Sequence, residues 1–374
     1  MSSPPPHPLV IGGGPAGAAA ALRLARAGAP VTLLERTVGP HDKVCGDFLS
    51  GPALAALAAL GIDAAALGGA PIARVRLVAG GRVAESALPF AACGLSRRAL
   101  DEALLAAASA AGARVRRGET ARGLRAVGRD LILERGGEAW RGETVLLATG
   151  KHDLRGAARP ARGHGAVGLK IYLALAPEQG ARLGDAMELV LLPGGYAGLQ
   201  RVEGGRTVLC VMLSRQAART VGASWDTLRD RLAAEAPHLA GRLAAAIPFA
   251  KRPLAVAGVP YGHLHAPRPG AAPGLFRLGD QAAVIPSLAG DGVAIALASA
   301  ALAARAVLAG ESAEVYHRRL RSALARPMRA AMLAHRAAVA LQAQGWLVGA
   351  CRLWPGLIGF TATRTRCYAG LADS

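Results

Sequence analysis

Three glycines near the start of the chain have the spacing that suits binding of a phosphate anion. Gly12, Gly14 and Gly17 form a G-x-G-x-x-G pattern between an apolar segment, 9–11, and an alanine-rich segment, 16–27. In this pattern the first glycine makes a tight turn, the second lets a pyrophosphate approach the backbone, and the third allows close packing of helix on strand. Unpaired N–H groups and the positive dipole end at the start of a helix then attract the anion.

A carboxylate further along supports a dinucleotide as the ligand. Glu35 ends a second apolar segment, 31–35, and follows the glycines by about twenty residues, where an acidic side chain accepts hydrogen bonds from ribose hydroxyls. The order strand, turn, helix, strand is a βαβ unit, and such units require a parallel sheet. The sequence therefore predicts a dinucleotide site here, to which we also assign Pro15, Ala16 and Arg36.

Four segments resemble the FAD-dependent oxidoreductases of the aromatic-hydroxylase and geranylgeranyl-reductase superfamily, which includes enzymes of the p-hydroxybenzoate hydroxylase type. They are the glycine turn, Leu-Ser-Arg-Arg-Ala-Leu-Asp at 95–101, Ala-Thr-Gly at 148–150, and a stretch that starts with Gly-Asp at 279–280 and reaches 292. Together they span most of residues 8–310. The resemblance implies that the dinucleotide is a tightly held FAD.

The resemblance also assigns roles to single residues. Arg97 would touch the adenosine–phosphate half of FAD, although its spacing alone suits an exposed helical arginine equally well. Asp280 would accept hydrogen bonds from ribitol or ribose, although an isolated aspartate there would suit a helix N-cap. A helix start near the flavin would stabilise the anionic reduced ring. The remaining residues assigned to FAD by these segments are Gly150, Gly279, Gly290, Asp291 and Gly292.

A further stretch narrows the resemblance toward the geranylgeranyl-reductase branch. Residues 43–50, Lys-Val-Cys-Gly-Asp-Phe-Leu-Ser, are similar to a loop that lies beside the isoalloxazine ring in that branch. Cys45 would then face the flavin or the substrate, which makes it a candidate catalytic residue; the alternative is a small packing residue. Gly46 would allow the backbone to approach the ring closely.

Other segments depart from the patterns of the superfamily. Of an aromatic Y-x-W-x-F-P signature in the substrate domain only Tyr196 remains, so Tyr196 is a candidate catalytic or pocket residue, with a core tyrosine as the alternative. Residues 151–156 match the hydroxylase pattern only loosely. A W-x-W-x-I-P motif is missing, which disfavours a flavin halogenase.

These motifs require an α/β fold in which separated segments assemble. We expect a Rossmann-type FAD-binding domain of the glutathione-reductase-2 type with an inserted mixed β-sheet substrate domain and a helical C-terminal segment. The expected bounds are 8–71, 96–155 and 275–311 for the FAD-binding domain, 72–95 and 156–274 for the substrate domain, 312–374 for the C-terminal segment, and 1–7 for a disordered tail.

Local patterns predict several elements within these domains. Ser96 is suited to cap a helix, 97–111, and glycines break the chain into a hairpin and a β-meander. The predicted elements are a hairpin at 74–88, a strand at 113–117, a meander at 120–142, a strand at 145–148, a helical stretch at 224–246, and an irregular tail after Pro355.

Composition limits the partners that this chain would bind. The net charge is +19, but its arginines are spread along the chain and aromatic residues make up only 4%, which argues against a nucleic-acid partner. Contact with anionic lipid or with an acidic redox partner protein stays open. Five cysteines without zinc spacing predict no metal site and a reducing, cytoplasmic location, with peripheral contact at the inner face of the membrane left open.

Two further groups of side chains each have two interpretations. His263 and His265 have the spacing of a surface pair more often than that of an acid–base pair. Trp346, Trp354 and Phe360 would either cover a lipophilic site or, as we expect, pack a C-terminal helix on the core.

These observations predict an FAD-dependent oxidoreductase that uses reduced flavin on a lipophilic isoprenoid- or polyketide-like substrate. One alternative is an FAD-dependent monooxygenase that hydroxylates a phenolic or aromatic substrate with NAD(P)H and O2. Another is a non-catalytic flavin electron-transfer protein. A second G-x-G-x-x-G after a later strand is missing, so NAD(P)H would bind only transiently as electron donor.

Overall fold

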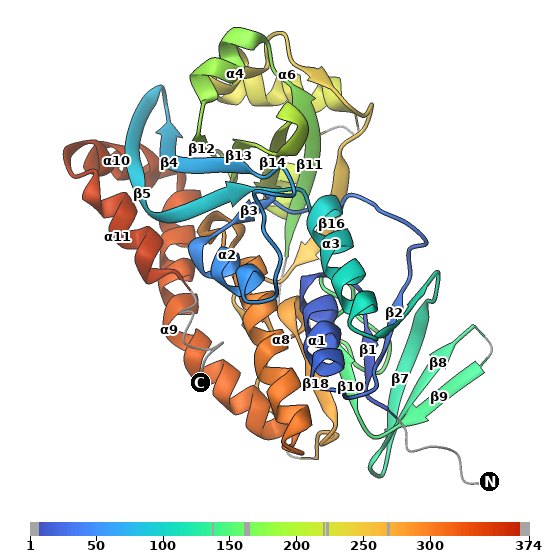
Figure 1. Cartoon of the computed structure of the whole chain (residues 1–374). Coiled ribbons are helices and arrows are strands. Elements are labelled where there is room, and N and C mark those ends of the chain that lie inside the picture. Colours follow the sequence, from blue (N-terminus) through green and yellow to red (C-terminus); the bar gives the residue numbers. More distant parts are fainter. Residues whose placement is uncertain are drawn as a thin grey trace, which may run out of the picture.

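The computed structural model describes residues 7–136, 138–160, 165–219, 221, 224–267 and 270–366. Apart from His7, the tail predicted at residues 1–7 lies outside the described residues, as does Cys367. Two sheets dominate the molecule, one in its lower half and one above it, and long C-terminal helices run along one side (Figure 1).

The lower sheet has five strands, all paired in parallel. Its order is β18 (Leu275–Arg277), β10 (Val145–Leu147), β1 (Leu9–Ile11), β2 (Thr32–Glu35) and β6 (Arg114–Arg117). Three separated parts of the chain therefore build one Rossmann-type sheet. The predicted α/β class is confirmed.

Both faces of this sheet are covered at its central strands β1 and β10, which explains why these two strands are apolar throughout, whereas the edge strand β6 carries arginines. Val10 points toward the helices α1 (Pro15–Arg26), α3 (Arg97–Ala110) and α8 (Gly292–Leu308). Its neighbours Leu9 and Ile11 point the other way, onto a three-stranded meander, because successive side chains alternate between faces. The meander consists of β7 (Ala121–Val127), β8 (Asp130–Arg135) and β9 (Glu138–Gly142).

The upper sheet has nine strands and mixed pairing, because β12 and β4 are parallel whereas its other pairs are antiparallel. Along the sheet the strands are β15 (Ile247–Pro248), β11 (Ala166–Ala174), β14 (Thr207–Leu213), β13 (Gly195–Arg201), β12 (Ala186–Leu192), β4 (Ala70–Ala79), β5 (Arg82–Gly94) and β3 (Phe48–Leu49), with β16 (Leu254–Val259) beside β11. One face packs on α6 (Trp225–Glu235) and α7 (Pro237–Leu243), and the other on the C-terminal helices.

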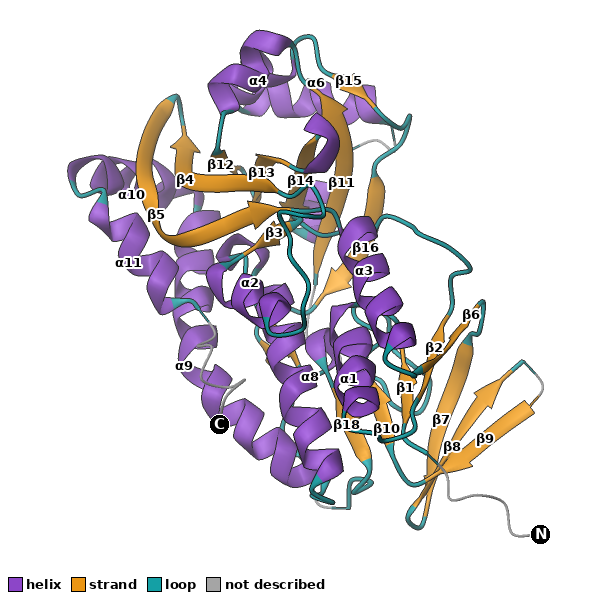
Figure 2. Ribbon diagram, viewed as in Figure 1, coloured by secondary structure: helices purple, strands orange, loops and turns teal. Residues whose placement is uncertain are grey.

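Several smaller elements lie around these layers (Figure 2). They are the helices α2 (Gly51–Ala58), α4 (Pro177–Leu183) and α5 (Arg215–Ala218) and the paired strands β17 (His263–Leu264) and β19 (Ala283–Val284). The expected Ser96 cap is present, since the Ser96 hydroxyl accepts a hydrogen bond from the Ala99 N–H at 3.2 Å. The helical stretch at 224–246 is divided by Pro237, which cannot donate to a continuing helix.

Two predictions for the C-terminal segment are wrong. It forms α9 (Ala313–Val339), α10 (Leu341–Leu353) and also α11 (Gly356–Arg364), so the irregular tail predicted after Pro355 is wrong; proline suits the start of a helix. Trp346, Trp354 and Phe360 are 83%, 68% and 57% exposed, so the expected packing of these rings on the core is also wrong. None of the helices within the described ranges has both the length and the apolar character needed to span a membrane.

The expected surface location of the histidine pair is wrong for His263. Its side chain is 2% exposed, and its Nε2 lies 3.2 Å from the Gln281 carbonyl oxygen. The His265 ring packs edge-on against His317, with 4.5 Å between ring centroids. Both histidines lie on the segment that pairs with β19, which the sequence alone did not show.

Candidate functional site

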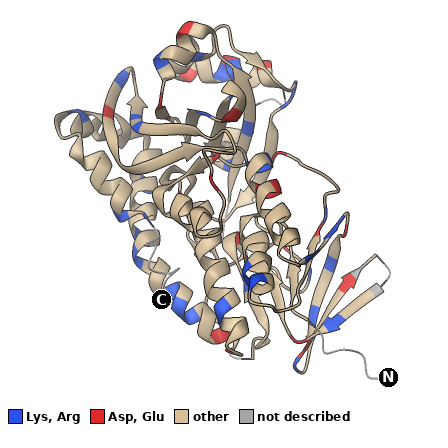
Figure 3. Cartoon of the chain, in the orientation of Figure 1, with Lys and Arg blue, Asp and Glu red and all other residues tan. Residues whose placement is uncertain are grey.

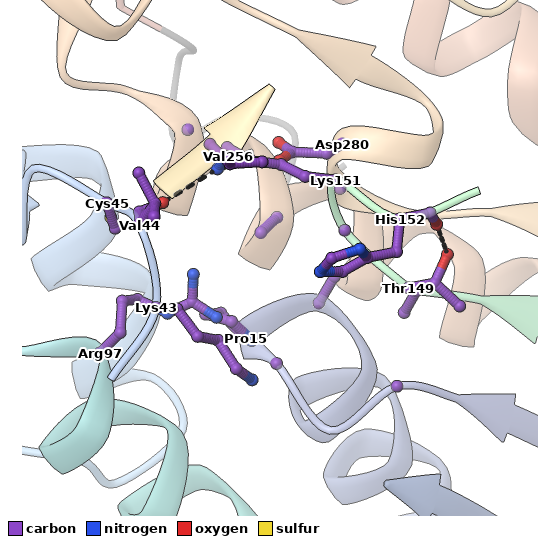
Figure 4. Close-up of a pocket in the computed structure, with 18 of the residues that line it drawn as sticks. Pro15, Lys43, Val44, Cys45, Arg97, Thr149, Lys151, His152, Val256 and Asp280 are labelled. Carbon is purple, nitrogen blue, oxygen red and sulfur yellow. Dashed lines mark hydrogen bonds and ion pairs between the residues drawn. The ribbon is translucent and has the colours of Figure 1, made fainter. Parts of the chain in front are cut away.

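A cavity of about 550 Å³ opens where the two sheets meet. That volume falls within the range of ordinary ligand pockets, roughly 300–1,000 Å³. Its wall combines the glycine turn, the loop around Cys45, the Ala-Thr-Gly turn, the Gly-Asp segment and residues of β14 and β16. Segments from both halves of the chain therefore face one space (Figure 4).

Steric constraints in the glycine turn explain why it lacks side chains. Gly12 has φ +105°, and a Cβ there would lie 2.4 Å from the Ala148 carbonyl oxygen. A Cβ on Gly17 would lie 1.9 Å from the Gly12 oxygen, so Gly17 permits the contact of α1 with the turn and does not line the cavity. Gly14, Pro15 and Ala16 line the cavity, and no described side chain caps the start of α1. The first N–H groups of α1 are thus available to an anion.

Glu35 lies beneath this turn as a buried carboxylate. It accepts hydrogen bonds from the Gly13 N–H at 2.7 Å and from the Thr37 N–H and hydroxyl at 3.0 and 2.8 Å. Burial alone would raise the Glu35 pKa, but the charge of Lys43 and these hydrogen bonds bring it below its ordinary value. Glu35 is therefore ionised at neutral pH, as a ribose acceptor must be. Its neighbour Arg36 lines the cavity as well.

Two cations stand next to the glycine turn. Arg97 is 14% exposed and lies close enough that a Cβ on Gly14 would be 3.1 Å from its Nη2, so the alternative of an exposed helical arginine does not hold. Asp101 pairs with both Arg97 and Lys43, at 2.8 and 2.9 Å. Lys43 was not assigned a role from the sequence, although it belongs to the stretch that contains Cys45.

The opposite wall carries a lysine that the sequence reasoning missed. Lys151 extends across the cavity, where its Nζ donates to the Val44 carbonyl oxygen at 3.3 Å and pairs with Asp280 at 3.4 Å (Figure 4). Burial lowers the Lys151 pKa, but Asp280 and Cys45 outweigh it and leave the pKa above its ordinary value. A positive charge therefore lies between the Gly-Asp segment and the Cys45 loop. In the sequence, Lys151 could have been found from its position directly after Gly150, the last residue of the Ala-Thr-Gly turn.

The Cys45 loop is anchored to the upper sheet by a buried ion pair. Asp47 accepts hydrogen bonds from Lys170 Nζ and from the Tyr172 hydroxyl, each at 2.6 Å, and the Asp47 and Lys170 side chains are fully buried. Asp47 has φ +56°, the one positive φ of a non-glycine residue in the described part of the chain. Cys45 and Gly46 line the cavity as a result, and a Cβ on Gly46 would meet no protein atom within 4 Å.

The start of α8 completes the wall at its inner end. Gly290 has φ +67°, and a Cβ there would lie 2.8 Å from the Phe48 ring, so this turn also requires glycine. Asp291 accepts from the Ser50 hydroxyl at 2.6 Å and from Arg366 at 3.2 Å, which commits its carboxylate to protein partners. The helix begins at Gly292. Gly290, Asp291 and Gly292 line the cavity, as do Gly150, Gly279 and Asp280.

Tyr196 does not line this cavity, which fits the core tyrosine given as the alternative. It is 3% exposed and lines a second cavity of about 360 Å³. Its hydroxyl accepts from the Leu288 N–H at 3.2 Å and lies 3.4 Å from the Tyr261 hydroxyl. Tyr261 lines both cavities, so it separates Tyr196 from the candidate site. The sequence analysis did not single out Tyr261.

Polar atoms left without partners show that the cavity is built for a ligand. In the part of the chain that the structure describes, His41 Nε2 and Asp42 Oδ1 are buried without a hydrogen-bond partner, and both residues line the cavity. An anion-binding turn, an ionised Glu35 and two cations beside it match the phosphates and ribose of FAD. The described residues contain no group of three or more His, Cys, Asp or Glu side chains placed to hold a metal ion.

Comparisons with known proteins agree with this assignment. Residues 7–130 match the family model described as FAD binding domain. A 54-residue stretch is 48% identical to the menaquinone reductase of Mycobacterium tuberculosis, covering 14% of this chain and 13% of that protein. The chain thus matches only a small part of the length of these curated relatives.

Solved structures extend the similarity over nearly the whole chain. A geranylgeranyl bacteriochlorophyll reductase-like protein from Thermoplasma acidophilum has TM-score 0.71 and 18% identity, covering 98% of this chain and 94% of its own. A myxobacterial chondrochloren halogenase has TM-score 0.72 and 19% identity, covering 97% and 91%. At these identities the likeness concerns the fold. Residues 7–130 therefore match an FAD-binding domain, and the chain shares its fold with these flavin-dependent enzymes and reductase-like proteins, as the sequence motifs predicted.

Proposed function

We propose that this protein is an FAD-dependent oxidoreductase that reduces a lipophilic isoprenoid- or polyketide-like substrate. The observation that carries the proposal is the two-sided character of the cavity. One part of its lining is the anion-binding turn with its cations, and another part, formed by Met212, Leu254, Val256 and Val259 of the upper sheet, is apolar. An oily substrate would bind against this apolar side, beside the Cys45 loop.

The residues on the polar side account for the cofactor. Gly12, Gly14 and Arg97 would hold the pyrophosphate, and Glu35 the ribose of the adenosine half. Bound FAD would accept electrons from a nicotinamide or from a redox partner protein and deliver them to the substrate as hydride.

Reduction of a double bond consumes one hydride and one proton, so the chain must also provide a proton. The half-buried thiol of Cys45 lies at the cavity wall and is our candidate for the proton donor. Lys151, whose charge faces the same loop, would stabilise negative charge that develops on the substrate or the reduced ring. Apolar side chains on the facing wall would exclude water.

The relatives support a lipophilic substrate over a small polar one. The short segment of high identity belongs to enzymes named menaquinone reductase, and one structural neighbour is named as geranylgeranyl bacteriochlorophyll reductase-like. Both names concern substrates with long hydrocarbon groups. The loop at 43–50 favours the same branch, whereas the missing aromatic signature around Tyr196 argues against naming a geranylgeranyl group itself.

The deciding experiment is stopped-flow absorbance of the purified protein. The flavin is reduced anaerobically with NAD(P)H or dithionite and then mixed either with oxygenated buffer or with a prenylated quinone. We expect slow reoxidation by oxygen and faster reoxidation by the quinone.

The other outcomes separate the alternatives. Fast reoxidation by oxygen together with a hydroxylated aromatic product would show a monooxygenase. Equal reoxidation rates with and without any organic acceptor would indicate an electron-transfer protein. A protein that is purified colourless and takes up no FAD would overturn the proposal altogether.

A further inference from the structure

The C-terminal helices present large apolar side chains to solvent. On α10 these are Trp346 and Leu353, 83% and 74% exposed, and the turn after α10 adds Trp354, 68% exposed. Phe360 on α11 is 57% exposed. Isolated exposed apolar residues are ordinary. Two tryptophans, a leucine and a phenylalanine within fifteen residues form a patch of the kind that marks an interaction site.

The exposed side chains lie opposite the face that packs on the protein. The buried residues of α10 are Gln344, Val348 and Cys351, which lie one turn apart, and the last two join the apolar cluster under the upper sheet. Trp346 and Leu353 are seven residues apart, so they project from one side of α10. The pair α10–α11 is thus amphipathic, with its second apolar face unpartnered.

The charge around this patch has one sign. Between residues 315 and 372 the sequence has no Asp or Glu and nine arginines. Arg336, Arg352 and Arg364 are exposed, and Arg364 lies over the Phe360 ring at 5.1 Å. In Figure 3 the ribbon of α10 and α11 has blue segments, which mark Lys and Arg, and no red ones. The helices that carry the apolar patch therefore bear positive charge without any acidic side chain, and Glu85 of the neighbouring β5 is paired with Arg74 and Arg76.

We propose that the α10–α11 face docks on the surface of an anionic lipid bilayer. Tryptophans are favoured at the boundary between headgroups and acyl chains, and arginines beside them are attracted to anionic headgroups. A second copy of the chain is a poorer occupant, because pairing would bring two acid-free basic faces together. Docking would place the protein where a lipophilic substrate is dissolved. It does not depend on the proposed function, since it concerns binding and not turnover.

The test measures vesicle binding without any reaction. The FAD-containing protein is sedimented with phosphatidylcholine vesicles, with and without added phosphatidylglycerol. We expect binding only to the anionic vesicles, reversed by salt, and a blue shift of tryptophan fluorescence from Trp346 and Trp354. The triple variant W346S/W354S/F360S should bind about tenfold more weakly.

A matched control uses apolar residues that are just as exposed elsewhere. Ile247 and Phe249 are 69% and 61% exposed and lie in and next to β15, so I247S/F249S should bind vesicles as the unaltered protein does. Equal binding by the triple variant and the unaltered protein would overturn the proposal. Absence of vesicle binding would overturn it too; if the triple variant then abolished a concentration-dependent dimer, the patch would be a self-association surface.

Discussion

At the scale of single residues, the cavity carries charged side chains on two walls and is lined by two cysteines, Cys45 and Cys210. Arg97, Lys43 and Lys151 gather positive charge that would face the phosphates of bound FAD and its anionic reduced ring. Burial raises the pKa of Cys210 to about 12, whereas Cys45 is only half-buried and lies on the loop that Lys151 reaches, so Cys45 is our candidate proton donor. Its neighbour Asp47 donates its N–H toward the Cys45 sulfur at 3.4 Å, which orients the thiol.

The first prediction concerns Cys45 itself. If its thiol supplies the proton, C45A should lower turnover by about 10²-fold while the FAD content is unchanged, because general acid catalysis contributes on that scale. Turnover is measured together with the ratio of flavin to protein absorbance. As a control, C351A removes a buried thiol on α10 that does not line the cavity, and it should leave turnover unchanged. Full turnover of C45A would remove Cys45 from the catalytic residues.

At the scale of elements, the start of α1 depends on contacts that only glycine permits. The helix approaches the turn so closely that Gly17 Cα has no room for a side chain above the Gly12 oxygen. The same principle governs Gly290 before α8, which packs on Phe48. Two helix N-termini thus reach the cavity because small residues let them pass next to backbone or ring atoms.

The second prediction tests this packing. G17A places a methyl group 1.9 Å from a backbone oxygen, so α1 must shift. We expect a loss of about 1–3 kcal/mol in the free energy of unfolding, typical of overpacking, and protein purified with little FAD. Urea titration and flavin absorbance measure both. G180A is the control, since a Cβ at Gly180 in α4 meets nothing within 4 Å; if G17A kept the FAD content of G180A, the tight contact would not matter for binding.

At the scale of the whole molecule, one buried ion pair joins the two halves of the site. Asp47 belongs to the loop that follows β2, whereas Lys170 and Tyr172 belong to β11 of the upper sheet. Gln200 of β13 adds a hydrogen bond to the Asp47 carbonyl oxygen at 2.8 Å. Burial raises the Asp47 pKa, although Lys170 and Tyr172 act in the opposite direction. Loss of the lysine would leave a buried carboxylate without its charge partner.

The third prediction follows from that arrangement. K170M should lower the free energy of unfolding by about 3–5 kcal/mol at neutral pH, the usual cost of breaking a buried ion pair. A carboxyl whose pKa is raised in the folded state stabilises the fold when protonated and loses that contribution as the pH rises, so the deficit of K170M should shrink in acid. Urea unfolding at several pH values measures it. K251M, at an exposed lysine, is the control. If K170M lost the same free energy of unfolding at every pH, a raised pKa of Asp47 would be contradicted.

The sequence by itself determined the parts of this protein that depend on spacing along the chain. The glycine turn, the start of α1, Glu35, the Ser96 cap and the α/β class follow from short patterns, because turns, caps and strand–helix order are local properties. The resemblance carried by separated motifs added the Gly-Asp segment and the Cys45 loop. These residues line or support one cavity in the structure.

Only the tertiary structure decided which distant side chains meet. Lys151 lies across from Val44, Asp47 pairs with Lys170, and Tyr261 stands between Tyr196 and the cavity. No local pattern contains these contacts, because they depend on how the upper sheet packs against the FAD-binding sheet. The burial of His263 and the exposure of Trp346 have the same origin, since an apolar or polar side chain is covered only where another element lies over it.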